Sequence, residues 1–322
     1  MTPFHPPLWL RGAHAQTLAP YFVRPRTRPP WRPERLELAD GDFVDLAHLA
    51  AAGDDARARV CLFHGLEGSV ESHYIGGLAT ALAREGFAVT LMHLRGCSGE
   101  PNRLPRAYHS GDTGDMRALF ATLREREPQQ PLMAVGFSLS GNALLKYLGE
   151  AGADAGIERA VAVSVPFDLA IAAGRIDQGF SRLYQAHFVR RMQASTHARI
   201  ARTGGLPIAT ARMAAARTFR EFDDAVTAPL HGFAGVDDYY TRASCRPWLA
   251  RIECPTLVVH ARDDPFVGRD AVPAPFEAGP GVELAISERG GHVGFIAADD
   301  GVRPYRWLNR RIPAWLAAVP PP

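Results

Sequence analysis

Three side chains far apart in the sequence could together perform nucleophilic catalysis, and Ser138 is the first of them. A serine hydroxyl attacks poorly until a base takes its proton and a third group orients that base. The stretch GFSLSGN, residues 136–142, lies between an apolar run and an amphipathic helical pattern. It matches the Gly-x-Ser half of the turn that exposes a nucleophilic serine between a strand and a helix. We therefore hypothesise that Ser138 attacks a carbonyl carbon.

Ser140 departs from the usual Gly-x-Ser-x-Gly pattern, because it stands where the second glycine is expected. That glycine relieves crowding where the helix packs on neighbouring strands. A serine adds only two heavy atoms and Gly141 follows at once, so we expect a tighter fit rather than loss of the turn. An isolated motif of this kind is more often structural than catalytic, so the hypothesis depends on finding an acid and a base.

The acid and the base follow in the order serine, acid, histidine that this strand-turn-helix arrangement requires. The strand-like run TLVVHAR, residues 256–262, is followed by two aspartates. We favour Asp264 over Asp263 because it lies three residues beyond a small residue at the strand's carboxyl end, and one of the pair is a turn initiator. His292 lies in a glycine-rich loop after the last strand-like run, and we expect it to be the general base.

The loop FHGLEG, residues 63–68, should complete the site by stabilising negative charge. An oxyanion hole needs two backbone N–H groups aimed at the developing oxyanion. We expect the N–H groups of Leu66 and Leu139 to supply them, because one follows the first buried strand and the other follows Ser138. His64 comes too early in the chain order to be the base, and we expect it to shape this loop.

Strand-like and helix-like segments alternate along most of the chain, which predicts what positions these side chains. Apolar runs without polar alternation are typical of strands covered on both faces. Alternation with helical patterns predicts right-handed βαβ units and a doubly wound, mostly parallel sheet. An antiparallel hairpin around Asp40-Gly41 should precede it. The expected buried strands are 59–65, 87–96, 131–138, 158–166, 254–262 and 281–292, and the expected helices are 74–86, 113–126, 141–152 and 305–318.

The alternation stops between residues 167 and 250, where helical patterns occur without a buried strand. The strands on either side need each other in one sheet, so an inserted helical cap is favoured over a separate helical domain. We predict a core of residues 34–166 and 251–322, a cap of 167–250, and a proline- and arginine-rich arm of 1–33 packed on the core. Aromatic residues of the cap could line a pocket or form its own core: Phe180, Tyr184, Phe188 and Phe233.

Composition excludes several classes of function. An apolar fraction of 47%, a charged fraction of 22% and a net charge of +2 suit a globular protein and give no sign of nucleic-acid binding. No phosphate-binding, dinucleotide or metal motif occurs, so we expect no cofactor and no metal. With no secretory signal or spanning segment recognised, we expect a cytoplasmic protein. Peripheral membrane contact and oligomeric state stay open. Arginines of the cap could meet an anionic headgroup, although a charged run is more often a solvated face: 182, 190, 191, 199 and 202.

Several motifs together resemble the YheT-like hydrolases, a branch of the α/β-hydrolase superfamily. They extend over nearly the whole chain: HGLEGSVESHY, MHLRGCSGEPNR, YHSGDTGDM, GFSLSGN, VDDYYTRAS, ARDDPF and GGHVGF. The resemblance implies the α/β-hydrolase fold with a helical cap and a charge relay of Ser138, Asp264 and His292. The family usually has glycine where this chain has Ser140.

We therefore expect a serine esterase acting on carboxylic esters with short or medium acyl chains, through an acyl-enzyme on Ser138. The substrate would be a small ester or a lipid-like molecule. The same triad could instead perform acyl transfer, thioester cleavage or lactone opening. A non-catalytic ligand-binding protein on the same fold is the alternative from another class.

Overall fold

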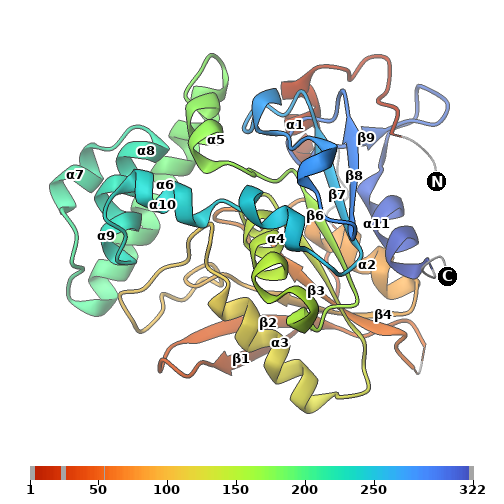
Figure 1. Ribbon diagram of the computed structural model, residues 1–322, viewed down its shortest axis with the longest axis horizontal. Helices are drawn as coiled ribbons and strands as arrows, with labels where there is room; N and C mark the ends of the chain where they lie inside the picture. Colours follow the sequence, from red (N-terminus) through yellow and green to blue (C-terminus); the bar gives the residue numbers. More distant parts are fainter. Residues whose placement is uncertain (1–3, 23–26, 54, 319–322) are drawn as a thin grey trace.

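A twisted eight-stranded sheet forms the centre of the computed structural model, which describes residues 4–22, 27–53 and 55–318 (Figure 1). Its strand order is β1-β2-β4-β3-β5-β6-β7-β8. Strands β3 to β8 run parallel, and β2 is antiparallel to β4. The predicted mostly parallel sheet is therefore confirmed. The strands are β1 (Arg32–Glu37), β2 (Phe43–Leu49), β3 (Ala58–Phe63), β4 (Phe87–Met92), β5 (Leu132–Phe137), β6 (Arg159–Val163), β7 (Thr256–Ala261) and β8 (Val282–Ser287).

The first two strands form the predicted hairpin. Strand β1 pairs antiparallel with β2, with Leu36 opposite Val44. The turn closes through the Leu38 N–H, which donates to the Asp42 carbonyl at 2.8 Å. Gly41 adopts φ 84°, a conformation that favours glycine. The side chain of Asp42 is left fully buried at this turn, where it holds a loop described below.

Helices cover both faces of the sheet, as the unbroken apolar strands predict. Helices α3 (Gly114–Arg126) and α4 (Leu139–Ala151) share one apolar cluster with the sheet. Helices α2 (Ile75–Arg84) and α11 (Leu308–Ala317) share the cluster on the opposite face. Strand β5 is wholly buried between these layers, so the chain leaving it toward α4 is held from both sides.

The N-terminal arm is more regular than its composition suggests. It contains helix α1 (Ala13–Phe22), whereas the proline and arginine content favoured an extended segment. Gln16 explains the difference, because its buried side chain donates to the carbonyls of Leu10 and Ile296 and accepts from the Ile296 N–H. Tertiary hydrogen bonds therefore stabilise a short helix with weak sequence signals. Ile296 belongs to β9 (Ile296–Ala297), which pairs with β10 (Tyr305–Arg306).

Helices fill the chain between β6 and β7 and project to one side of the sheet (Figure 1). The stretch ATARMAAARTFREFDDAV, residues 209–226, has a helical sequence pattern but forms separate helices, because Thr218 and Glu221 form a capping box that starts a new helix. None of the described helices is both long enough and apolar enough to cross a membrane. The segments are α5 (Leu169–Ile176), α6 (Ser181–Thr203), α7 (Thr210–Ala215), α8 (Phe219–Phe222), a π-helical turn (Asp223–Thr227), α9 (Ala228–Leu230), α10 (Val236–Ala243) and a 3₁₀ segment (Arg246–Arg251).

Candidate active site

Ser138 occupies a strained turn between β5 and α4. Its backbone has φ 52° and ψ −119°, in the left-handed region that side chains rarely adopt. The Ser138 N–H donates to the Val163 carbonyl at 2.8 Å, which anchors the turn to β6. A Cβ on Gly136 would lie 2.6 Å from the Ser140 carbonyl oxygen, and one on Gly141 would lie 2.9 Å from a Val165 methyl group. The close approach expected of the second motif glycine therefore occurs at Gly141.

Ser140 is accommodated without crowding. Its side chain is fully buried, and its hydroxyl donates to the His64 carbonyl at 2.5 Å. A glycine at this position would leave that buried carbonyl without this partner. The departure from the usual motif thus links the start of α4 to the loop after β3.

The structure brings together Ser138, His292 and Asp264. The Nε2 atom of His292 lies 3.0 Å from Ser138 Oγ, and its Nδ1 atom lies 2.8 Å from Asp264 Oδ2. Because the carboxylate can only accept, the pair is satisfied when Nδ1–H donates to Asp264 and Nε2 accepts from the serine hydroxyl. Asp264 is 1% exposed. Burial opposes its ionisation, but the charge of His292 and hydrogen bonds from His292 and the Phe266 N–H hold its pKa below the ordinary value.

Asp263 points elsewhere, as expected for the second of the two aspartates. Its Oδ1 atom accepts from the Gly291 N–H at 3.0 Å, directly before His292. Burial raises the pKa of Asp263. Its carboxyl group therefore holds the histidine loop, while its neighbour contacts the imidazole.

Thr17 is a positioning residue that the sequence did not indicate. Its Oγ1 atom accepts from the His292 N–H at 2.9 Å and donates to the Ala13 carbonyl at 2.8 Å. A Cβ on Gly291 would lie 2.5 Å from that same carbonyl oxygen. Helix α1 thus packs directly on the histidine loop. A threonine inside a short helix that itself contains Pro20 carries no motif, so only the tertiary contact identifies it.

The loop after β3 presents one of the two expected oxyanion donors. Among the described residues, neither the Leu66 N–H nor the Leu139 N–H has a hydrogen-bond partner, and both residues line the same cavity as Ser138. Leu139 begins α4, where N–H groups are free to bind an anion. His64 shapes the loop: its Nδ1 atom donates to the Gly65 carbonyl at 2.8 Å and its Nε2 atom accepts from the Leu94 N–H at 3.1 Å.

Asn142, the last residue of the GFSLSGN stretch, connects helix α4 to two other segments. Its buried amide donates to the carbonyls of Ser110 and Ala243 at 2.8 and 2.7 Å, and its oxygen accepts from the Cys245 N–H at 2.9 Å. The residues at the end of α10 and a loop that lines the cavity are thereby fixed to α4. Its position one turn after Ser138 was the available signal for this role.

A cavity of about 460 Å³ opens onto Ser138 and His292. Of the four cap aromatics considered from the sequence, Phe188 lines it, while Phe180 is half exposed and contacts His14. The Phe266 ring stacks on His292 with centroids 4.1 Å apart. The wall is largely apolar. Apart from Val267, the following apolar lining residues lie between β6 and β7: Leu169, Ala172, Ile176, Met192, Phe219, Phe222, Val226, Leu230 and Val267.

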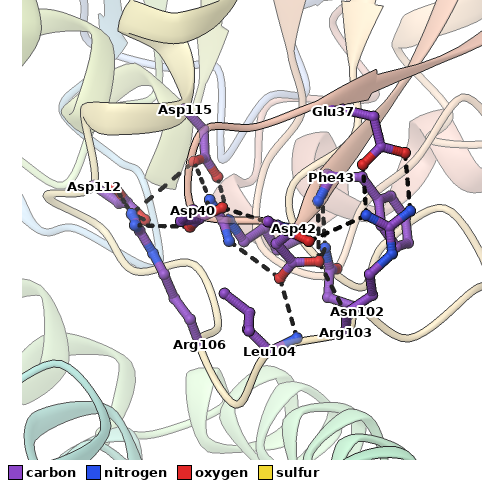
Figure 2. Close-up of polar contacts among 12 residues, drawn as sticks. Glu37, Asp40, Asp42, Phe43, Asn102, Arg103, Leu104, Arg106, Asp112 and Asp115 are labelled. Atoms are coloured by element: carbon purple, nitrogen blue, oxygen red, sulfur yellow. Dashed lines mark hydrogen bonds and ion pairs between the residues drawn. The ribbon is translucent and has the colours of Figure 1, made fainter.

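The part of this wall formed by residues 107–110 follows a loop that a buried polar network holds (Figure 2). Asp42 Oδ1 accepts from the Asn102 amide at 2.9 Å and from the Arg103 N–H at 3.0 Å. Burial opposes ionisation of Asp42, but these hydrogen bonds, another from the Phe43 N–H, and the charge of Arg95 lower its pKa. The side chain of Arg95 also pairs with Asp115 at 2.7 Å. The hairpin turn, the loop and the start of α3 are therefore fixed together.

Comparison with known proteins identifies the fold family. The family model described as the alpha/beta hydrolase fold matches residues 58–299. The chain belongs to the α/β hydrolase fold family, which confirms the expected fold class.

Within that family it is 43% identical over 97% of its length to YheT of Escherichia coli (strain K12), classed as a candidate esterase, covering 92% of that protein. The expected resemblance to YheT-like hydrolases is thereby confirmed. It is 30% identical to a monoacylglycerol lipase of Saccharomyces cerevisiae, over 78% of this chain and 58% of the lipase. The esterase Pf2001 of Pyrococcus furiosus shares the fold at a TM-score of 0.53 and 16% identity, with 89% of this chain and 91% of that one covered.

Proposed function

We propose that this protein hydrolyses carboxylic esters with short or medium acyl chains through an acyl-enzyme on Ser138. The observation that carries the proposal is the unbroken hydrogen-bond sequence from Asp264 through His292 to Ser138, at the wall of a largely apolar cavity. The names of the Escherichia coli and yeast relatives, an esterase and a lipase, support an ester as substrate.

In the acylation step, Ser138 Oγ forms a bond to the ester carbonyl carbon while its proton passes to His292 Nε2. Asp264 stabilises the imidazolium and stays ionised. The N–H groups of Leu66 and Leu139 bind the oxyanion of the tetrahedral intermediate. When the bond to the leaving oxygen breaks, the imidazolium donates its proton to the departing alcohol.

Water then completes the cycle. His292 takes a proton from a water molecule whose oxygen attacks the acyl carbon. The second tetrahedral intermediate collapses, the proton returns to Ser138 Oγ, and the free acid leaves. The largely apolar wall formed with the cap favours an aliphatic acyl chain, and the volume of about 460 Å³ suits a short or medium one.

The proposal is tested with Ser138→Ala, using a fluorophosphonate probe and p-nitrophenyl esters of increasing chain length. We expect Ser138→Ala to lose labelling and to lose about 10⁴-fold or more in kcat, since removal of a triad member has that effect. Ser140→Ala is the matched control, because it removes a nearby hydroxyl that does not face His292, and it should still label. A folded wild-type protein that neither labels nor turns over any ester would favour a non-catalytic binding role.

A further inference from the structure

Arg199 is a buried cation without a counter-ion at the wall of the active-site cavity. Its side chain lines the cavity, and the residue is 6% exposed. Within the described residues its guanidinium makes no hydrogen bond and has no carboxylate within 4.0 Å, although it offers five N–H donors that face the cavity. Burial lowers the pKa of Arg199, but arginine stays protonated in proteins. A buried, unpaired guanidinium is unfavourable unless an anion joins it.

The other charged side chains at the cavity leave Arg199 free. The negative charge of Glu67 acts on Arg199, but the two carboxylate oxygens of Glu67 accept from the hydroxyls of Tyr108 and Ser195 at 2.8 and 2.6 Å. Asp223 is held by Thr227 and Tyr240. Glu71 pairs with Arg28 at 3.1 Å. The other cationic side chain that lines the cavity, Arg191, donates to the Glu67 carbonyl.

Helix α6 places Arg199 about two turns beyond the part of the helix that belongs to the apolar cluster packed against Leu66. The residues of α6 that line the cavity follow helical spacing: His187, Phe188, Arg191, Met192, Ser195, Thr196 and Arg199. The apolar residues of this face, Phe188 and Met192, lie in its first half, and its second half is polar throughout. Leu66 packs against the cap cluster that contains Met192. Arg199 lies seven residues further, about 10 Å along the axis. The head of a long helical side chain points back toward the N-terminus, which brings the guanidinium closer than that.

His231 adds a second unsatisfied polar atom to the cavity wall. Its Nε2 atom is buried without a partner among the described residues, and its ring packs on His109 with centroids 4.6 Å apart. Burial and the charges of neighbours that include Arg199 lower the pKa of His231 to about 3, so this ring stays neutral at pH 7. A neutral imidazole N–H can donate to an anion without adding charge.

We propose that Arg199 binds a carboxylate or phosphate group carried by the ester substrate, roughly six to eight bonds from the scissile carbonyl. The proposal rests on the proposed esterase function and specifies its substrate class. Of the five cap arginines considered from the sequence, Arg199 is the one that combines burial, a place at the cavity wall and a free guanidinium. Arg182, by contrast, is exposed and lies 3.9 Å from Asp177.

The test compares p-nitrophenyl octanoate with mono-p-nitrophenyl suberate, which differ in a terminal carboxylate. The quantity measured is the ratio of their kcat/KM values, suberate over octanoate. Arg199→Met should lower this ratio about tenfold or more, through KM of the suberate ester, because a charge-assisted hydrogen bond is lost. Arg199→Lys should recover part of it. Arg190→Met is the matched control, an exposed arginine of α6 outside the cavity, and should leave the ratio unchanged.

Inhibition of octanoate hydrolysis by free suberate or by inorganic phosphate identifies the anion. Suberate acting alone assigns a carboxylate, and phosphate acting at millimolar concentration assigns a phosphate, with Arg199→Met abolishing either effect. Thermal melts show whether Arg199→Met folds. If it does not fold, the kcat/KM ratio of Arg199→Lys and the inhibition of the wild type by each anion test the proposal. A ratio that changes less than threefold in folded Arg199→Met, with neither anion inhibiting the wild type, would overturn the assignment. If the Arg199 proposal fails in this way, loss of octanoate turnover in Ser138→Ala would still support the proposed esterase function.

Discussion

At the scale of single residues, the site depends on side chains that hold the backbone as much as on those that react. Ser138 keeps a positive φ because β5, α4 and the Val163 carbonyl surround it. Strain of this kind persists only where neighbouring contacts overdetermine it. Ser140 contributes such a contact through the His64 carbonyl, on the loop that carries Leu66. A residue that departs from the usual motif thus supports both the turn that holds Ser138 and the loop that carries Leu66.

Ser140→Ala tests that support. The buried His64 carbonyl would lose its partner, so the free energy of unfolding should fall by about 1–3 kcal/mol. Ester turnover should fall less than about tenfold, because Ser138 and His292 keep their contacts. Urea unfolding and steady-state kinetics measure the two effects. A variant as stable as the wild type would show that the hydrogen bond contributes nothing.

Thr17→Val tests whether the arm positions the histidine. The change keeps the shape and removes the acceptor of the His292 N–H, so kcat should fall by about tenfold to a hundredfold, as small misplacements of catalytic groups do. Thr80→Val is the control, since Thr80 makes the same bond to the carbonyl four residues earlier, in α2, away from the site. Equal losses in the two variants would assign Thr17 a structural role only.

At the scale of elements, the hairpin turn before the sheet determines where the cavity loop lies. Asp42 and Arg95 are both buried and form an ion pair at 3.1 Å, and Asp42 also caps the backbone at Arg103. Arg95 keeps Asp40 and Asp115 as partners when Asp42 is replaced. Both oxygens of Asp42 accept hydrogen bonds, however, so the NH2 group of an asparagine would face a donor at either position and leave it without its buried acceptor.

Asp42→Asn should therefore lower the free energy of unfolding by about 1–3 kcal/mol. Arg103→Gln breaks the exposed pair with Glu37 in the same network and should lower the free energy of unfolding much less, because solvent screens an exposed ion pair. Denaturant unfolding of the two variants gives the comparison. If both changes cost the same, the network is held by its loop geometry and not by the buried charge.

The sequence predicted well those elements whose position follows from one strong local pattern. Buried parallel strands read as continuous apolar runs, so β3 to β7 lie where they were expected. The order of serine, acid and histidine along the chain was also sufficient to nominate the three side chains that the structure brings together. Helix α1 and Thr17 were missed because their stability comes from contacts with the loop at 290–296, which no local pattern records. The break before α8 was missed although Thr218 and Glu221 signalled it.

At the scale of the whole molecule, buried neutral histidines connect stability to pH. Burial lowers the pKa of five described histidines to about 3 or 4: His64, His73, His109, His231 and His260. They resist protonation in the folded state, whereas an unfolded chain protonates histidine near pH 6.5. Their contribution to stability is complete above pH 6.5 and is lost as the pH falls toward 4.

The free energy of unfolding should therefore drop steeply between pH 7 and pH 5, with an uptake of about two or more protons on unfolding. Asp223 opposes this in part, because burial raises its pKa to about 6 and its contribution declines as the pH rises through that value. Urea titrations at pH 5, 6 and 7 give the slope. A stability that is flat over this range would contradict burial of the five rings.

The contact between Thr17 and His292 joins residues 275 positions apart. On a ribosome, the first of these residues emerges long before the second is synthesised, while domains generally begin to fold from the N-terminal side. The turn that holds Ser138 can form from the first half of the chain, but its proton acceptor arrives only with the last strand and then needs the waiting arm. A nascent chain would therefore carry a formed turn at Ser138 and would lack the histidine of the proposed triad until synthesis is almost finished.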